Sequence, residues 1–396
     1  MGGHRGRLDQ PTMITAVSPT RTATMIRSVT VTEFEWVPDG SRHPLRKFAV
    51  DITTHDHQQG SYVALWSAPP LAVPQVISAA RLLIGQDPRD RERLWNLAAR
   101  SLAKHDRIGY GALDIALWDL AGRSVDQPVW ALLGRQRDRL PAYVSTVSGR
   151  KGSGALGSAA AYADYAEDCV NRGALAYKFH SFPGSDVADE IAILRAVGER
   201  LRGRADVMTD PGKGLDTLAD ALRLGRVCDE VDAFWWEDPL RGDAAPAHRI
   251  LRERVRTPLL ITEFVRPLEH RIGLAHQGAT DLLRADPELD MGITGVIKTA
   301  HAAEALGIDL EVHAAGPAQR HCMAAIRNTN YYELGLLDPE LGNPLMPPVY
   351  ADGYAEDLSA IGADGCVPVP PGPGLGVAYD RDWIDSHAVA THTIAD

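Results

Sequence analysis

The stretch Asp206-Val-Met-Thr-Asp210 decides the fold, because two later stretches repeat its design. Phe234-Trp-Trp-Glu237 and Leu259-Leu-Ile-Thr-Glu263 are also short, mostly apolar runs that close on a carboxylate. The closing acids are spaced by about the length of one strand–helix–loop unit, so they stand at equivalent ends of successive buried strands. Any one of them alone reads as an ordinary surface acid. Carboxylate oxygens are hard ligands, so the three together predict a site for a hard divalent cation, Mg²⁺ before Zn²⁺.

The chain around these stretches alternates strand-like runs with amphipathic helices from Pro141 onward. Such alternation predicts a parallel sheet. Eight strands with seven helices predict a closed sheet, so the expected fold class is α/β, a (β/α)7β TIM-like barrel that lacks its last helix. The expected strands are Ala142–Thr146, Leu175–His180, Asp206–Asp210, Ala233–Glu237, Leu259–Glu263, Leu282–Asp286, Asp309–His313 and Tyr331–Gly335. The expected helices are 158–172, 186–202, 215–229, 244–255, 268–276, 292–306 and 317–327.

The residues before the barrel predict a separate α+β capping domain. Val29–Phe34 and Phe48–Thr53 favour strands of a small antiparallel sheet. Residues 74–104 carry helical periodicity, and Gly109–Gly122 is a strongly apolar helix. The Pro/Gly-rich run Val367–Gly376 belongs to a tail that we expect to return to this domain. The predicted boundaries are 1–25 for a disordered extension, 26–140 for the capping domain, 141–345 for the barrel and 346–396 for the returning C-terminal segment.

Composition narrows the function classes. The chain has 396 residues, 45% hydrophobic and 23% charged, which is typical of a soluble globular protein. A net charge of -11 argues against a general binder of nucleic acid or anionic membranes. A small anionic substrate stays compatible, because a bound cation reverses the local sign. No apolar run approaches the roughly 20 residues of a membrane span. Residues 1–24 lack the apolar region of a secretory signal, and Met25 is a candidate start.

The four cysteines are scattered, without a CxxC pair or the spacing of a metal finger. They are interpreted as buried thiols of a protein in the reducing cytoplasm. They are Cys169, Cys228, Cys322 and Cys366.

Polar residues close the predicted strands at the end where barrels of this kind carry their catalytic groups. His313 closes the seventh strand beside Asp286 on the sixth, and a neighbouring carboxylate can accept the imidazole N–H and fix its tautomer. Lys178 and His180 are two residues apart on one strand, so they point the same way. Mutual repulsion is expected to lower the pKa of both toward neutrality, where a base is useful. Alternatively, Lys178 pairs with the acidic cluster. Glu333 lies on the eighth strand.

The motifs taken together resemble the mandelate racemase subgroup of the enolase superfamily. Ile108–Arg123 (IGYGALDIALWDLAGR), followed by Pro128-Val-Trp-Ala-Leu-Leu-Gly134, is similar to that family's helix before the barrel. Trp236-Glu-Asp-Pro239 is similar to its second metal strand, and Pro373-Gly-Leu-Gly376 to its closing motif. The resemblance runs from roughly residue 26 to 385, nearly the whole chain.

The resemblance implies roles for the strand-end residues. Asp210, Glu237 and Glu263 match the family's three Mg²⁺ ligands, one ion per active site. Asp286 and His313 match its Asp–His dyad. The acid on its eighth strand corresponds to Glu333, which can donate a hydrogen bond if acidic surroundings keep it protonated.

Two departures from the family pattern affect the expected site. The family often carries Lys-x-Lys on the second strand, whereas here the pair is Lys178-Phe-His180, so His180 takes the position of the second lysine. Either Lys178 or His180 is then the second base. The family's Asp-x-Asn is replaced by Asp210-Pro-Gly212, which removes a polar group and is expected to widen the pocket.

The activity implied by the resemblance is abstraction of the proton α to a carboxylate, giving an enediolate. We expect a sugar acid as the small-molecule substrate, with β-elimination of water to a 2-keto-3-deoxy acid. A racemase or epimerase and a cycloisomerase, through the same intermediate, are the alternatives. Loops around residues 38–60 are expected to set specificity, whereas His43, Arg46, His55, Asp56 and His57 are expected to be mostly solvated. The family tends to form homo-oligomers.

Two alternative functions belong to other classes of protein, a dehydrogenase and a non-catalytic metal-binding protein. Gly152-Ser-Gly-Ala-Leu-Gly157 matches the GxGxxG pattern of a dinucleotide-dependent dehydrogenase. The next strand, however, ends in Lys178 and His180 instead of the acid that would hold a ribose, so a flexible loop explains the glycines better. A non-catalytic relative that kept the metal site is disfavoured by the accompanying dyad.

Overall fold

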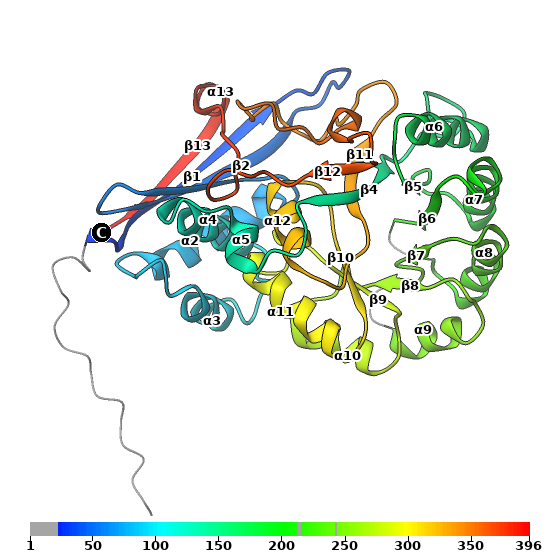
Figure 1. The fold of residues 1–396 in the computed structure, drawn as a ribbon, viewed down its shortest axis with the longest axis horizontal. Coiled ribbons are helices and arrows are strands. Elements are labelled where there is room, and N and C mark those ends of the chain that lie inside the picture. The colour runs from blue at the N-terminus through cyan, green and yellow to red at the C-terminus, as the bar shows by residue number, and fades with distance from the viewer. Residues whose placement is uncertain (1–22, 213–214, 242–243) are drawn as a thin grey trace, which may run out of the picture.

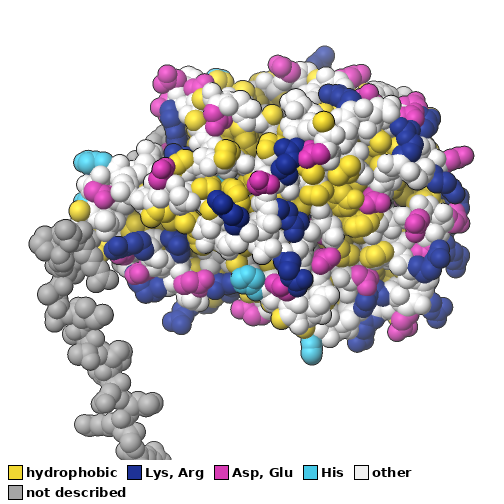
Figure 2. Space-filling view, viewed as in Figure 1, with side chains coloured by type: hydrophobic (Ala, Val, Ile, Leu, Met, Phe, Trp, Pro, Cys, Tyr) yellow, Lys and Arg dark blue, Asp and Glu magenta, His cyan; other side chains and the backbone are white. Residues whose placement is uncertain are grey.

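A computed structural model describes residues 23–212, 215–241 and 244–396, in which a capping sheet stands beside a curled parallel sheet (Figure 1). The extension predicted for residues 1–25 lies outside the described residues, apart from its last three. In the described part of the chain, no helix is long and apolar enough to cross a membrane. Basic and acidic side chains are interspersed on the face in Figure 2.

The capping domain is a four-stranded antiparallel sheet with strand order β13-β1-β2-β3. The C-terminal strand β13 lies beside the first strand of the chain (Figure 1), so the tail returns to the cap as predicted. Helices α2 and α4 pack on the sheet, and α3 packs on both helices. The strands are β1 (Ile26–Trp36), β2 (Leu45–Thr54), β3 (Gln59–Ala64) and β13 (Ala388–Ala395), and the helices are α2 (Pro69–Leu83), α3 (Arg91–Ser101), α4 (Tyr110–Ser124) and α5 (Val129–Leu133).

Three features of the cap differ from the sequence predictions. The third strand, β3, was not predicted, since its first residues Gln-Gly-Ser lack strand character. Gly60 is required there because a Cβ atom at this position would lie 2.2 Å from the carbonyl oxygen of Ala116 in α4. The periodic stretch 74–104 forms two helices, separated where Gly85 takes a φ of +71°. Strand β13 was also not predicted.

The eight parallel strands form one curled sheet with the order β10-β9-β8-β7-β6-β5-β4-β11. Its helices form the outer layer (Figure 1). The strands are β4 (Arg139–Thr146), β5 (Ala176–His180), β6 (Asp206–Asp210), β7 (Trp235–Glu237), β8 (Leu259–Ile261), β9 (Leu282–Ala285), β10 (Asp309–Val312) and β11 (Tyr332–Leu337). The helices are α6 (Ala159–Asn171), α7 (Val187–Leu201), α8 (Leu218–Val231), α9 (Ala245–Arg252), α10 (Leu268–His276), α11 (Gly292–Ala305) and α12 (Pro317–Ala325).

The barrel prediction is confirmed in the order and type of its elements, with shorter strands at the catalytic edge. Glu263, Asp286 and His313 were predicted as strand residues, but β8, β9 and β10 end one or two residues earlier. Thr262 takes a φ of +97°, which turns the chain out of the ladder just before Glu263. These three side chains therefore stand on the first residues of the loops, at the mouth.

The first and last edges of the curled sheet are joined by side chains. The described residues of β10 and β11 form no ladder with each other. Instead, Glu311 on β10 accepts hydrogen bonds from the backbone N–H of Asn330 and from its amide, just before β11. At the mouth, Glu333 on β11 accepts from the N–H of Ala314 after β10.

One layer of the barrel interior is apolar. Six strands each contribute one side chain to this layer, which are Tyr143, Ala176, Met208, Trp235, Leu260 and Leu282. This packed layer leaves the polar groups at the carboxyl ends of the strands as the place for chemistry.

The C-terminal segment touches both parts of the molecule. Strand β12 (Cys366–Pro368) pairs with β4, and a 3-10 turn (Leu358–Ala360) and helix α13 (Arg381–Ser386) flank it in the chain. All four cysteines are free thiols, and three are buried as predicted, whereas Cys366 is only half-buried. The predicted domain boundaries and the cytoplasmic location stay predictions.

Candidate active site

Three carboxylates converge at the mouth of the barrel, as the spacing of the opening motif predicts. Asp210 and Glu237 are the last residues of β6 and β7, and Glu263 lies two residues beyond β8. One oxygen from each lies within 4.8 Å of the others. Asp210 and Glu237 are buried, and Glu263 is half-buried. An all-oxygen set of three converging carboxylates fits a hard cation such as Mg²⁺ and would hold it.

Lys178 on β5 is the cationic partner of this acidic cluster. Its Nζ atom lies 2.6 Å from Oε2 of Glu237, 2.9 Å from Oε1 of Glu333 and 3.7 Å from Oδ2 of Asp210. Burial by itself would lower the pKa of Lys178, but the charges of Glu237 and Glu333 outweigh it and hold the pKa well above its usual value. The prediction of a lysine tuned toward neutrality is therefore wrong for this side chain, and the alternative of an ion-pair partner matches its contacts.

His180 closes the same strand and reaches the first acid of the cluster. Its Nε2 atom lies 3.1 Å from Oδ2 of Asp210, and its Nδ1 atom lies 2.7 Å from the carbonyl oxygen of Thr146. Burial acts to lower the pKa of His180, but Asp210 outweighs it and raises the pKa above the ordinary value. Lys178 does act to lower the pKa of His180, as predicted, but the attraction of Asp210 is stronger, so the predicted net lowering is wrong.

The predicted dyad is assembled across β9 and β10. Nδ1 of His313 lies 2.7 Å from Oδ2 of Asp286, so the carboxylate can accept the Nδ1–H. In this tautomer, Nε2 of the neutral imidazole is a proton acceptor. Nε2 lies 3.6 Å from Oε1 of Glu263, on the side of the three carboxylates. Burial would lower the pKa of His313, but Glu263 and Asp286 outweigh it and raise the pKa to about 9.

Glu333 has basic rather than acidic surroundings, so the condition for a protonated, hydrogen-bond-donating carboxyl is not met. Its Oε2 atom lies 2.9 Å from Nη2 of Arg284 and accepts the N–H of Ala314 at 2.7 Å, while Oε1 faces Lys178. Burial acts to raise the pKa of Glu333, but Lys178 and Arg284 outweigh it and hold the pKa well below its usual value. Glu333 is thus an ionised acceptor that positions two cations.

Arg284 is the principal site residue missed by the sequence interpretation. It is fully buried, with Nε 2.7 Å from Oε1 of Glu237, and its Nη2 donates to the hydroxyl of Tyr143 at 2.7 Å. A usable signal existed, because Arg284 and Asp286 are two residues apart and alternation places both on the inner face. With Lys178, it supplies two buried positive charges beneath three metal-site acids and Glu333.

Glu288 fastens the cap to the loop that carries Asp286. Its Oε1 accepts from the Tyr62 hydroxyl and the N–H of Leu65, and its Oε2 accepts from the N–H groups of Trp66 and Ser67. All four hydrogen bonds are 2.7 to 2.9 Å long. The cap residues that follow β3 are therefore fixed beside the dyad, an arrangement that no local sequence signal could have revealed.

Trp66 is the cap side chain that reaches the dyad. Its ring centroid is 6.3 Å from that of His313, in an edge-to-face arrangement. Its Nε1–H donates to the carbonyl oxygen of Ala315 at 2.7 Å, which holds the indole in place. The capping domain therefore forms one wall of the site through Trp66, which lies outside the 38–60 loops expected to set specificity, and the role of those loops stays a prediction.

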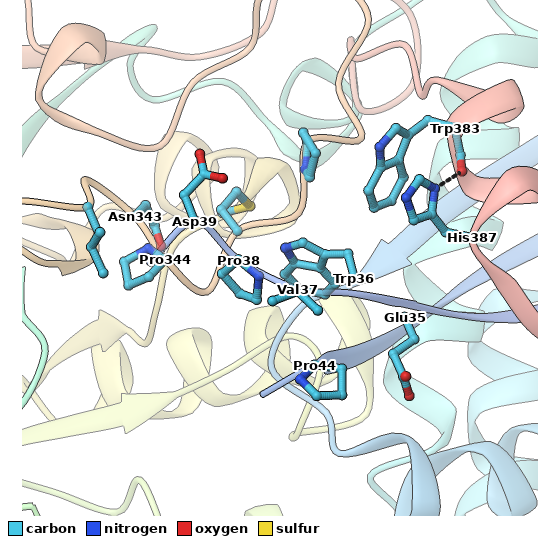
Figure 3. Close-up of a pocket in the computed structure, with 13 residues that line it drawn as sticks. Glu35, Trp36, Val37, Pro38, Asp39, Pro44, Asn343, Pro344, Trp383 and His387 are labelled. Carbon is cyan, nitrogen blue, oxygen red and sulfur yellow. Dashed lines mark hydrogen bonds between the residues drawn. The ribbon is translucent and has the colours of Figure 1, made fainter. Parts of the chain in front are cut away.

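The loop between β1 and β2 borders a separate cavity of about 570 Å³ (Figure 3). Val37, Pro38 and Asp39 line one side, and Asn343 and Pro344, from the segment after β11, line another. None of the predicted metal or dyad residues lines it. Because this loop packs against the segment that follows the last barrel strand, it lies at the edge of the mouth.

Other polar positions named from the sequence lie apart from the site. The loop residues expected to be solvated are exposed, which confirms that expectation, and they are His43, Arg46, His55, Asp56 and His57. The glycine-rich 152–157 segment folds on itself, with the N–H of Gly152 donating to the carbonyl oxygen of Gly157. This is the loop that the sequence interpretation preferred over a dinucleotide fingerprint.

The replaced family asparagine is compensated by the backbone. The N–H of Gly212 donates to Oδ1 of Asp210 at 2.7 Å, and Gly212 takes a φ of +60° that suits glycine. The expected widening of the pocket at this point stays a prediction, since residues 213–214 lie outside the described residues.

A capped (β/α)7β barrel with three acids on successive strands and an Asp–His pair defines an enolase-type scaffold, and comparisons with known proteins agree. Residues 161–383 match the family described as enolase C-terminal domain-like. Residues 41–134 match the mandelate racemase/muconate lactonizing enzyme N-terminal domain. The chain therefore belongs to the mandelate racemase/muconate lactonizing enzyme group of the enolase superfamily.

Individual relatives cover most of the chain. A crystal structure of D-glucarate dehydratase from Agrobacterium tumefaciens, complexed with magnesium, is 32% identical with a TM-score of 0.83 and covers 93% of this chain and 100% of that one. D-galactarolactone cycloisomerase of Agrobacterium fabrum is 27% identical over 355 residues, 84% of this chain and 89% of the relative. A D-galactonate dehydratase family member of Oceanicola granulosus is 26% identical over 338 residues, 76% of this chain and 80% of the relative.

Proposed function

We propose that the protein removes the proton α to the carboxylate of a hydroxylated sugar acid and then expels a β-hydroxyl as water, leaving a 2-keto-3-deoxy acid. The observation that carries this proposal is the placement of the His313–Asp286 pair against the three-carboxylate cluster, with Nε2 of His313 3.6 Å from Glu263. A proton acceptor and a cation site must adjoin in this way if a carboxylate substrate is to lose its α-proton.

The chemistry needs stabilisation of an enediolate, because an α-proton next to a carboxylate is very weakly acidic. Asp210, Glu237 and Glu263 would hold Mg²⁺, and the bound ion would supply Lewis-acid polarisation of the substrate carboxylate. The D-glucarate dehydratase relative was solved with magnesium, which supports the choice of ion.

His313 is the proposed base on one face of the α-carbon. Asp286 accepts its Nδ1–H, fixes the tautomer that presents Nε2 and stabilises the imidazolium that forms. Lys178 is proposed to act as a fixed positive charge, since Glu237 and Glu333 hold its ammonium in place. It would donate a hydrogen bond to the substrate carboxylate as negative charge develops there.

His180 is the proposed proton-transfer group on the opposite side. Thr146 and Asp210 orient its two nitrogens, so the ring keeps a fixed position at the end of β5. In a dehydration, the departing hydroxyl takes up a proton to leave as water, and the resulting enol becomes the keto acid. His180 or the protonated His313 would provide that proton.

Cycloisomerisation is the second candidate, because the cycloisomerase relative matches 84% of this chain at 27% identity. It would begin with the same α-proton transfer, but the oxygen expelled from the β-carbon would stay attached to the rest of the substrate, so no water would be released. Racemisation or epimerisation would instead return a proton to the opposite face. The product therefore distinguishes the reactions.

A panel of aldonic and aldaric acids, with Mg²⁺ and with EDTA, tests the proposal. Keto-acid formation and exchange of the α-proton in D₂O are measured together, with His313→Asn as the inactive control. Dehydration requires keto product that depends on Mg²⁺. Exchange without keto product would transfer the assignment to an isomerase, and the absence of both with every acid would refute the proposal.

A further inference from the structure

Lys47, the third residue of strand β2, is a half-buried cation that has no carboxylate partner in the described part of the chain. Its ammonium donates a hydrogen bond to the carbonyl oxygen of Leu65, the residue after the neighbouring strand β3. Among the residues that the structure describes, no carboxylate oxygen lies within 4.0 Å of Nζ. An ammonium has three N–H donors, so two of them remain for a ligand or for water.

The surroundings of Lys47 change the pKa of its ammonium. Burial lowers the pKa of Lys47, and the negative charge of Glu288 only partly opposes this effect. Glu288 already accepts four hydrogen bonds from the cap, so its charge is largely satisfied. Lys178 offers a contrast, since two carboxylates lie within 2.9 Å of its ammonium. A half-buried cation without such close partners can pair with an anionic ligand.

The ring of Trp66 lies near both Lys47 and His313 of the candidate active site. Nζ of Lys47 is 6.0 Å from the centre of the Trp66 ring, and that ring is 6.3 Å from the ring of His313. The ammonium and the imidazole are therefore no further apart than these two distances laid end to end. Glu288 and the bond to Ala315 hold this part of the cap, so the separation is built into the fold.

An extended six-carbon sugar acid is long enough to span a separation up to this limit. With carbon–carbon bonds of about 1.5 Å, an extended six-carbon chain places its far terminal carbon roughly 5–6 Å from the α-carbon. Hydrogen-bond lengths of about 3 Å at each end then bring His313 to the α-proton and Lys47 to the far terminus. At that terminus, an alcohol would leave the ammonium uncompensated, whereas a carboxylate would pair with it.

We propose that Lys47 binds the distal carboxylate of the substrate, and that the substrate is accordingly a sugar diacid of about six carbons rather than a monoacid. This inference rests on the proposed function, since it places the proximal carboxylate at the three-acid site. The cap then contributes the cation that makes the site selective for a substrate of this length with a second carboxylate.

The test compares kcat/KM for a six-carbon aldaric acid and for the aldonic acid of the same configuration. Wild-type protein is expected to prefer the diacid by about a hundredfold, the worth of one hydrogen-bonded charge pair. Lys47→Met should remove most of this preference by lowering kcat/KM for the diacid alone, and Lys47→Arg should keep most of it. Arg46→Met is the matched control, because Arg46 is the exposed neighbour that pairs with Glu35.

The outcomes separate this inference from the proposed function. Equal use of both acids by the wild type, or an equal loss for both acids in Lys47→Met, would overturn the role of Lys47 while α-proton exchange still supported the reaction. A purely structural role for the bond to Leu65 would lower both activities and the melting temperature together. Absence of exchange with every acid would instead refute the proposed function.

Discussion

The barrel mouth and the capping wall contribute charge to the candidate site in different ways. At the mouth, cations and anions are closely paired, since Lys178 pairs with three carboxylates and Arg284 with two. In the cap, Lys47 is half-buried, and among the described residues its ammonium donates a hydrogen bond to a carbonyl oxygen and to no carboxylate. The charged groups at the mouth are thus held in place by one another. In the cap, by contrast, the ammonium of Lys47 is proposed to gain its carboxylate partner from the substrate. Reactivity and selectivity are expected to respond to different substitutions.

The largest effect is expected for His313→Asn, which removes the proposed base from the mouth. Loss of general-base catalysis should lower kcat by roughly 10²–10⁴-fold and abolish α-proton exchange on that face. Kinetics and exchange measured by NMR check this. If Lys47→Met lowers kcat for the aldaric and the aldonic acid as much as His313→Asn does, the proposed separation of reactivity at the mouth from selectivity in the cap is wrong.

Arg284→Met should produce the largest loss of stability. Removal of one partner from a buried ion network costs about 3–5 kcal/mol, because Glu237 and Glu333 keep uncompensated charge. Excess Mg²⁺ should recover part of the loss by neutralising Glu237. Denaturant unfolding with Mg²⁺ and with EDTA measures both effects. The exposed pair of Arg327 and Glu304 provides the control, and Arg327→Met should change stability by less than about 1 kcal/mol. Equal losses in the two variants would contradict the paired-charge account.

Glu288→Gln tests the connection between the two regions. An amide nitrogen cannot accept hydrogen bonds as a carboxylate oxygen does. The two hydrogen bonds from the cap to one of the Glu288 oxygens should therefore be lost. We expect a loss of about 1–3 kcal/mol in unfolding free energy and a rise in KM as Trp66 loosens. Glu35→Gln, on the exposed part of the cap, is the control. An unchanged KM would show that Trp66 is held independently of Glu288.

The smallest effect concerns the base of the barrel, where Glu311 joins its two edges. Burial raises the pKa of Glu311 to about 7, against the opposing hydrogen bonds of Asn330. The folded protein then binds a proton more tightly than the unfolded chain. Its contribution to stability is complete below the unfolded pKa of about 4.3 and is lost as the pH rises toward 7.

Glu311→Gln should therefore gain stability relative to wild type between pH 5 and pH 8, by on the order of 2 kcal/mol across the window. Unfolding free energies at several pH values check the slope, with the exposed Glu340→Gln as control. A difference that stays constant with pH would mean that Glu311 remains ionised throughout.

The barrel was the more predictable of the two regions. Its strands are buried runs separated by amphipathic helices, so their order, and the side on which Asp210, Glu237 and Glu263 emerge, could be predicted from the sequence. The cap was predicted less completely. Its third strand depends on Gly60 fitting against α4, and β13 depends on pairing with a strand more than 350 residues earlier. Neither contact leaves a local pattern.

The sequence by itself determined which acids and bases gather at the mouth, because strand alternation and a regular βα spacing fix where side chains emerge. Only the tertiary structure decided their charge states and partners. Electrostatic interactions act through space, so Lys178 and Glu333 acquire their pKa shifts from residues on other strands. For the same reason, the position of Lys47 near the dyad could be recognised only after Glu288 and Trp66 had brought the cap against the barrel.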